Sequence, residues 1–196
     1  MEPKIILELD KSNNYIKEVE IKNIESYVPV SRAFGVTELV KEDEIFFHGG
    51  SNKNKDFCHI DLLDLNSYEF IPVTEKSLVD RFFIFDKTLS GHCSIFIKNK
   101  KESKIVIYGG FDGNSYSNAI YEIETCNYQL KQIDIRRNST GEYPLPRCYH
   151  SCNYEENTNS FYVFGGWNGS ILQANNQNFF ALWKFDFICK IIVKIY

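Results

Sequence analysis

The chain has 196 residues, of which 43% are hydrophobic, so it is long enough to bury a core and too apolar to be a disordered segment. Its 22 basic and 26 acidic residues give a formal net charge of -4, and neither sign forms a long block. This balance argues against a surface dedicated to nucleic acid or to an anionic membrane.

The chain opens on two strand-like stretches, IILELD at residues 5–10 and YIKEVEI at residues 15–21. The first residues contain acidic Glu2 and Glu8, and they lack the basic and apolar regions of a signal peptide. We therefore expect a cytoplasmic protein. Its six cysteines are expected to be reduced and to occupy apolar positions, because disulfide frameworks belong to secreted chains.

Three apolar runs that end in a glycine pair follow along the chain: EIFFHGG, KIVIYGG and SFYVFGG. Each pair is followed by a polar loop and then by a strand-like stretch, in turn HIDLLDL, AIYEIE and ALWKFDF. After a short turn comes a further strand-like stretch, in turn YEFIPV, YQLKQI and IIVKIY. The recurrence at a similar spacing predicts one structural unit that is built repeatedly.

A strand-like stretch also precedes each run, most clearly PLPRCYHSCNY at residues 144–154 and less clearly PVSRAFGVTELV and LSGHCSIFI. Four short strands per unit, without the 3.6-residue period of a helix, predict a β-meander. The runs IVIY and FYVF do not alternate between apolar and polar residues. We therefore expect their strands to be covered on both faces by neighbouring sheets.

These units divide the chain into a single repeat region over residues 1–196. We expect a half unit at 3–22 and full units at 28–73, 88–133 and 144–196. The segment at 74–87 is extra to the repeat and is expected to be an insertion between units.

The third unit carries the most telling motif, because Pro146, Arg147 and His150 form P-R-x-x-H ahead of the run that ends in Gly-Gly. With the acidic residue that closes each third strand, this pattern resembles the kelch motif, whose units are the blades of a β-propeller. The first unit departs from it at Phe34 and Gly35, near the expected histidine, and the second keeps His92 without Pro-Arg.

The resemblance implies an all-β fold: a kelch-type β-propeller of about three and a half four-stranded blades, as an incomplete or fragmentary ring. Another propeller and a β-sandwich are the alternatives. Propellers have about 4 to 8 blades, so three explanations stay open. The chain is a fragment of a longer protein or a truncated gene model, two chains complete one ring, or the ring is unusually small. An open ring would leave exposed blade edges, from which we predict self-association.

The glycine pairs are expected to be structural, because glycine permits positive φ and close approach of a neighbouring backbone. A phosphate-binding loop is disfavoured, since no Lys-Ser/Thr and no predicted helix follow the pairs. The residues assigned to this structural repeat are Gly49, Gly50, Gly109, Gly110, Gly165, Gly166, Arg147 and His150.

In the kelch family the loops after the glycine pairs and those between blades line one face and hold the partner. The matching candidates here are Asn52, Lys53, Phe111, Asp112, Asn114, Trp167 and Asn168, flanked by Ser51 and Ser170, with Phe34 and Tyr149 from the inter-blade side. Phe111 and Trp167 are either aromatic anchors for a partner or fold back over the neighbouring blade.

The resulting functional prediction is a non-enzymatic protein-interaction scaffold or adaptor, with a protein partner, no cofactor, no nucleic acid and no membrane. A carbohydrate-active, oxidase or epimerase enzyme of the galactose-oxidase type is the alternative, as is a non-functional fragment. Cys148, His150 and Cys152 alternate along one predicted strand. A metal site there is disfavoured, since alternate strand residues lie about 7 Å apart, and no catalytic residue is assigned.

Overall fold

The computed structural model describes residues 5–10, 15–20, 27–73, 88–98, 103–137, 141–169 and 179–195. The expected insertion at 74–87 and Ser170 lie outside these ranges. The described residues form strands β1 to β15 and contain no helix that is long and apolar enough to span a bilayer.

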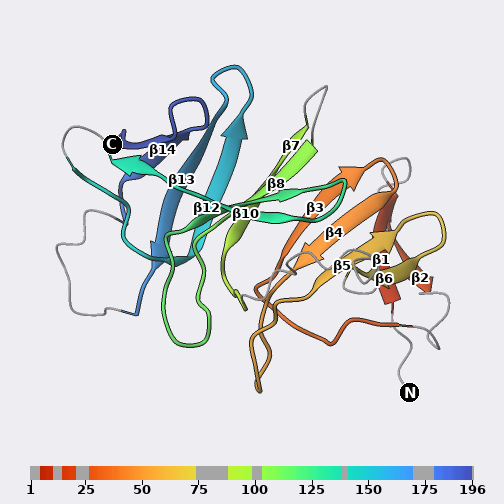
Figure 1. Ribbon diagram of the computed structural model, residues 1–196. Coiled ribbons are helices and arrows are strands. Elements are labelled where there is room, and N and C mark those ends of the chain that lie inside the picture. Colours follow the sequence, from red (N-terminus) through yellow and green to blue (C-terminus); the bar gives the residue numbers. More distant parts are fainter. Residues whose placement is uncertain are drawn as a thin grey trace.

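Three antiparallel meanders follow one another along the chain (Figure 1). The first sheet contains β3 (Val36–Lys41), β4 (Glu44–His48), β5 (Ile60–Asp64) and β6 (Glu69–Pro72). The second contains β7 (Cys93–Lys98), β8 (Ser103–Tyr108), β9 (Ile120–Glu124) and β10 (Leu130–Ile133). The third contains β12 (Cys148–Glu155), β13 (Ser160–Trp167), β14 (Leu182–Asp186) and β15 (Ile191–Lys194). A separate hairpin joins β1 (Ile5–Asp10) to β2 (Tyr15–Glu20).

This all-β arrangement confirms the predicted fold class, a set of four-stranded blades of an incomplete kelch-type propeller. One element differs from the prediction, because the third sheet has a fifth strand, β11 (Arg136–Arg137). It pairs in parallel with the outer strand β15, opposite Ile191 and Ile192. Part of the connection from the second sheet to the third therefore lies along the outer edge of the third sheet. It supplies hydrogen-bond partners for some of the backbone groups of β15.

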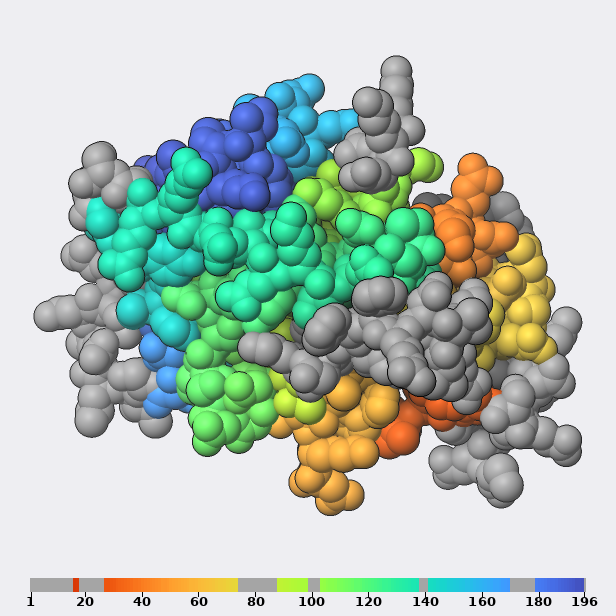
Figure 2. Space-filling model, in the orientation of Figure 1, coloured from red at the N-terminus to blue at the C-terminus, as the bar shows by residue number. Residues whose placement is uncertain are grey.

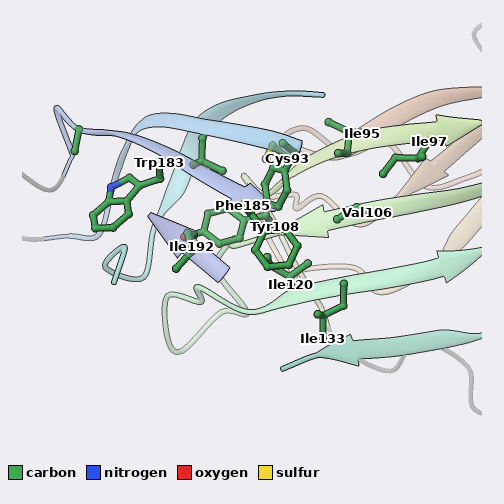
Figure 3. Close-up of a cluster of buried hydrophobic side chains, with 13 residues drawn as sticks. Cys93, Ile95, Ile97, Val106, Tyr108, Ile120, Ile133, Trp183, Phe185 and Ile192 are labelled. Carbon is green, nitrogen blue, oxygen red and sulfur yellow. The ribbon is translucent and has the colours of Figure 1, made fainter. Parts of the chain in front are cut away.

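The three sheets stand side by side in a fan, with their faces against one another (Figure 1). The strands β3, β7 and β12 are the inner ones and lie next to each other. One apolar core fills the space between the first and second sheets. A second core lies between the second and third sheets and includes Val106 and Tyr108 of β8 and Trp183 and Phe185 of β14 (Figure 3). The two ends of the row are therefore sheet faces, rather than the sheet edges that the sequence led us to expect.

The position of a sheet in the row decides how its apolar run is buried. Residues 105–108 of β8, the run IVIY, are all buried because a sheet packs on each side, as predicted. In β13 the prediction for FYVF is wrong. Phe161 and Val163 face the second sheet and are each 1% exposed, whereas Phe164 on the other face is 48% exposed. In the part of the chain that the structure describes, no further sheet covers that face.

The glycine pairs lie where the next sheet approaches most closely. A Cβ on Gly109, whose φ is +69°, would be 2.6 Å from His150 Cε1 and 2.8 Å from the Arg147 carbonyl oxygen. The N–H of Gly110 donates to that same Arg147 oxygen at 2.8 Å. Gly49 and Gly50 make the equivalent contacts with the start of the second sheet. At Gly165, with φ +77°, nothing lies within 4 Å of such a Cβ.

The histidine of each following sheet fills the space that the glycine leaves. His150 Nε2 donates to the Tyr108 carbonyl oxygen at 3.1 Å, and its ring meets the Tyr108 ring edge to face at 5.1 Å. His92 Nε2 lies 3.0 Å from His48 Nδ1 in the preceding sheet. Burial, followed by the charge of Arg147, lowers the pKa of His150 to about 4. These junction imidazoles are therefore uncharged at neutral pH.

Arg147 fixes the start of the third sheet. Its side chain is fully buried, and it donates to the carbonyl oxygens of Leu145 at 3.0 Å and Gly165 at 2.8 Å. Arg32, at the same place in the first sheet, instead pairs with the buried carboxylate of Asp61. The second sheet has the buried, apolar Leu89 there. The inner end of each sheet is thus anchored by a different interaction.

Substituting Gly109 by alanine should destabilise the fold more than substituting Gly165. Both glycines have positive φ, which costs an alanine about 1 to 2 kcal/mol. Only at Gly109 would the new methyl group also collide with the next sheet, which adds about 1 to 3 kcal/mol. Urea unfolding of Gly109→Ala and Gly165→Ala measures the difference. Equal losses would mean that the close approach between the sheets does not hold them together.

Stability should fall on acidification, in part because of His150. In the unfolded chain a histidine takes up a proton below about pH 6.5, whereas the pKa of about 4 keeps folded His150 neutral. The free energy of unfolding should therefore decrease between about pH 6.5 and pH 4. His150→Gln should reduce this slope by about 1 kcal/mol per pH unit, and the exposed control His59→Gln should not. Identical slopes in His150→Gln and the parent chain, from urea unfolding at stepped pH, would contradict this.

Candidate partner-binding surface

The loops that follow the glycine pairs leave the row of sheets at one end. Figure 1 shows the loops after β4 and β8 at the lower end, whereas the turns from β9 to β10 and from β14 to β15 lie higher in the view, at the other end of their strands. In the space-filling view the loops of the first two sheets protrude from the lower surface as gold and green lobes (Figure 2). Antiparallel strand order alone produces this segregation, because every second connection returns to the same end.

One residue per sheet adopts the left-handed backbone conformation at the start of the inner strand or just ahead of it. These residues are Phe34, Gly91 and Tyr149, with φ values of 61°, 62° and 56°. The Gly91 N–H donates to the Phe34 carbonyl oxygen at 2.8 Å, and the Tyr149 N–H donates to the Gly91 oxygen at 2.6 Å. The three positions thus form a hydrogen-bonded row across the inner ends of the three sheets.

The two aromatic rings of this row meet above the central glycine. Their centroids are 5.2 Å apart in an edge-to-face arrangement, and a Cβ on Gly91 would be 2.8 Å from the Tyr149 ring. Phe34 is nevertheless 55% exposed and Tyr149 53% exposed. The contact between the rings therefore leaves more than half of each side chain in water.

The left-handed conformation is unfavourable for these two residues by about 1 to 2 kcal/mol each. The backbone does not require a side chain there, because Gly91 holds the same place. Tyr128, another aromatic residue with positive φ, packs on Phe46 and donates a hydrogen bond to Glu44 Oε1 at 3.0 Å. Phe34 and Tyr149 gain no such burial. Strain without a matching gain in packing is a reason to look for a binding role.

A second aromatic group lies in the adjoining loops. The Tyr116 ring lies 4.9 Å from the ring of Phe111 and 5.8 Å from that of Trp167. Trp167 comes from the third sheet and Tyr116 from the loop of the second, so the indole does fold against its neighbour. It is still 44% exposed. The contact with Tyr116 agrees with the interpretation that Trp167 folds back over the neighbouring blade, and its role as an anchor for a partner stays a prediction.

Each of these loops also rests on the loop before it. A Cβ on Gly113 would be 2.8 Å from Asp56 Oδ2, and one on Gly169 would be 3.1 Å from the Tyr116 hydroxyl. Asp56 and Tyr116 hold the same place in their loops and were missed by the sequence analysis. The one sequence feature that they share is their position, because each follows its glycine pair by the same number of residues. The side chains of Phe34, Phe111, Tyr116, Tyr149 and Trp167 are called the aromatic rim below.

Two of the predicted contact residues turn out to hold their own loops. Asn52 Oδ1 accepts the N–H groups of Asn54 and Lys55 at 2.9 and 3.1 Å. Asp112 Oδ1 accepts those of Asn114 and Ser115 at 2.9 and 2.7 Å. These backbone hydrogen bonds lower the pKa of Asp112, so it stays charged at neutral pH.

The remaining candidates lie on the same lower loops. Lys53 and Asn114 are exposed at the loop tips, and Asn168 directly follows the end of β13. Whether any of them contacts a partner stays a prediction.

Cysteine and histidine do not gather into a ligand set in the part of the chain that is described. Cys152 Sγ donates to the Ser94 carbonyl oxygen at 3.3 Å, and no three His, Cys, Asp or Glu side chains of the described ranges could hold one metal ion. All six cysteines are free thiols. Cys126 and Cys189 are exposed in turns, contrary to the expectation of apolar positions.

A cavity of about 490 Å³ lies at the opposite end of the molecule, lined by residues of the second sheet and by Lys41 of the first. Its lining includes Lys41, Lys104, Lys131 and Glu122. Lys104 pairs with Glu122, and Lys41 pairs with Glu44 at 2.9 Å. Because these charges are largely compensated, the cavity offers no strong attraction for an ionic ligand.

Comparison with known proteins gives a consistent but distant similarity, and no family model matches the chain. The chain is 27% identical to the human Rab9 effector protein with kelch motifs over 128 residues, 64% of this chain and 30% of that protein. It is 32% identical to the Caenorhabditis elegans host cell factor homolog hcf-1 over 65 residues, 33% of this chain and 8% of that protein. It is 24% identical to human host cell factor 1 over 136 residues, 69% of this chain and 6% of that protein.

The chain thus spans 30% or less of the length of these curated relatives. Their similarity agrees with the repeated four-stranded sheets and with the glycine-pair junctions. The chain is therefore kelch-like in sequence and in structure.

Proposed function

We propose that this chain is a protein-interaction scaffold of the kelch-repeat type, which holds a protein partner on the aromatic rim. One observation carries the proposal: Phe34 and Tyr149 are more than half exposed, in a strained backbone conformation that a glycine adopts at the equivalent place. Exposed aromatic side chains that are fixed by a rigid backbone are the usual anchors of protein interfaces.

The mechanism would be preorganisation. The loops of the rim are held by the side chains of Asn52 and Asp112, by contacts between successive loops, and by sheets that pack through the glycine pairs. A partner would therefore bind without the loss of conformational entropy that ordering a flexible loop requires. Loops on a rigid scaffold are where binding residues are most often found.

The relatives support a binding role over an enzymatic one. Their names are those of an effector and of host cell factors, and neither is the name of an enzyme. The identity of the partner of this chain is a separate question, since each match covers a small part of the relative.

Removing a rim aromatic should weaken partner binding without weakening the fold. Tyr149→Gly removes the ring and also the backbone strain, so its midpoint of urea unfolding should be unchanged or higher. Trp167→Ala should lower the midpoint only slightly. Each variant should reduce the amount of partner captured by the chain by about 30-fold, the effect of losing an anchor of about 2 kcal/mol.

Ile188→Ala is the matched control, because Ile188 is 78% exposed in a turn at the other end of the molecule. Capture followed by quantitative mass spectrometry gives the comparison. If the rim variants capture the same proteins as the parent chain and as Ile188→Ala, the rim is not the binding surface. A large loss of stability in Trp167→Ala would mean that the indole belongs to the core.

We further propose that copies of the chain associate through the open face of the third sheet. Phe164 is exposed there beside Gly165, where a Cβ would meet nothing within 4 Å, whereas the equivalent Tyr108 is buried by the next sheet. Phe164→Ser should shift the chain towards monomer by about tenfold in dissociation constant. Light scattering over a range of concentrations measures this, and a monomeric parent chain would contradict it.

A further inference from the structure

A carboxylate stands beside the aromatic rim without a cation to neutralise it. Asp56 forms no ion pair within the described ranges of the chain. Two cationic side chains of the same sheet have other partners. Arg32 pairs with Asp61, and the Lys55 ammonium lies 5.1 Å from the centre of the Phe57 ring. Asp56 is therefore a negative charge available to a ligand.

Asp56 is tied to the Phe34 side of the rim, because Ser51 forms β-bridges with both Asp56 and Ala33, the residue that precedes Phe34. Burial and the Cys148 thiol raise the pKa of the Tyr149 hydroxyl, and the Asp56 carboxylate raises it further. Tyr149 in turn contacts Phe34. The loop of the second sheet adds Asp112, a further carboxylate at the same end of the molecule. Exposed aromatic faces and unneutralised carboxylates are thus neighbours on one surface.

This combination selects for a particular kind of side chain. A cation is attracted to the face of an aromatic ring and to a carboxylate at the same time. Arginine is favoured over lysine, since its planar guanidinium stacks on a ring while its edge donates to both oxygens of a carboxylate. A glutamate side chain in the same position would be repelled by the Asp56 carboxylate.

We propose that the aromatic rim binds an extended peptide segment of the partner through an arginine side chain, whose guanidinium pairs with Asp56 and lies against the ring of Tyr149. The proposal rests on the function proposed above and specifies its chemistry. The apolar part of the peptide lies along Phe111, Tyr116 and Trp167. Those rings supply contact area, and Asp56 supplies the selectivity for charge.

The test uses three blocked peptides that differ only at the central residue: Gly-Pro-Ala-Arg-Ala-Pro-Gly and versions with Leu or Glu in place of Arg. Each is titrated into the isotope-labelled chain while NMR shifts are followed. The Arg peptide should perturb residues of the rim and bind about tenfold more tightly than the Leu peptide. The Glu peptide should bind more weakly than the Leu peptide.

Asp56→Asn should remove this preference, so that the Arg and Leu peptides bind within about twofold of each other. Asp43→Asn is the matched control, because Asp43 is an exposed carboxylate in the β3–β4 turn at the opposite end of the molecule. The preference for Arg should persist in that variant. Tyr149→Gly should weaken the Arg peptide more than the Leu peptide.

Equal binding of the Arg and Glu peptides at the rim would overturn the proposal. The proposal would also be overturned if the Arg peptide caused no NMR shifts at the rim at a concentration of about 10 mM. Even weak specific binding has a dissociation constant below that concentration. In either case, capture that still depends on Tyr149 and Trp167 would leave the proposed scaffold function standing. If the peptides show no preference and capture does not depend on Tyr149 and Trp167, both the arginine proposal and the proposed scaffold function are wrong.

Discussion

The close approach between each glycine pair and the next sheet is the contact on which the rest of this structure depends. Because Gly49 and Gly109 have no side chain, a backbone carbonyl and a histidine ring of the following sheet occupy the space beside them. This brings the inner strands β3, β7 and β12 together and aligns their leading residues. The hydrogen-bonded row of Phe34, Gly91 and Tyr149 is a direct result of that alignment.

The same alignment explains why the candidate site is a surface rather than a pocket. Each sheet contributes one left-handed residue and one loop, and the loops overlap as Gly113 rests on Asp56 and Gly169 on Tyr116. Side chains of different sheets are thereby placed side by side without a helix or a cofactor to organise them. A repeated backbone with variable loop residues is a simple way to present a specific binding surface.

Much of this fold could be predicted from the sequence, because strand patterns and glycine pairs are local signals. The parallel pairing of Arg136 and Arg137 with β15 could not, since two charged residues carry no strand signal of their own. The exposure of Phe164 was also missed, because the run FYVF looks the same whether one or both of its faces are covered. Asn52 and Asp112 were predicted to face a partner, and only the hydrogen bonds show that they hold their own loops. Asp56 and Tyr116 share no chemistry, so their common place emerged only from the packing of the loops.

The most direct test of this account is amide hydrogen exchange of the chain, alone and in complex with a protein that it captures. Protection should increase at residues 33–35, 51–57, 111–117 and 147–149, which form one end of the molecule. Residues 64–69, 124–130 and 186–190 at the other end should exchange at unchanged rates. Protection confined to that second group of residues would contradict the account and move the binding surface to the opposite end.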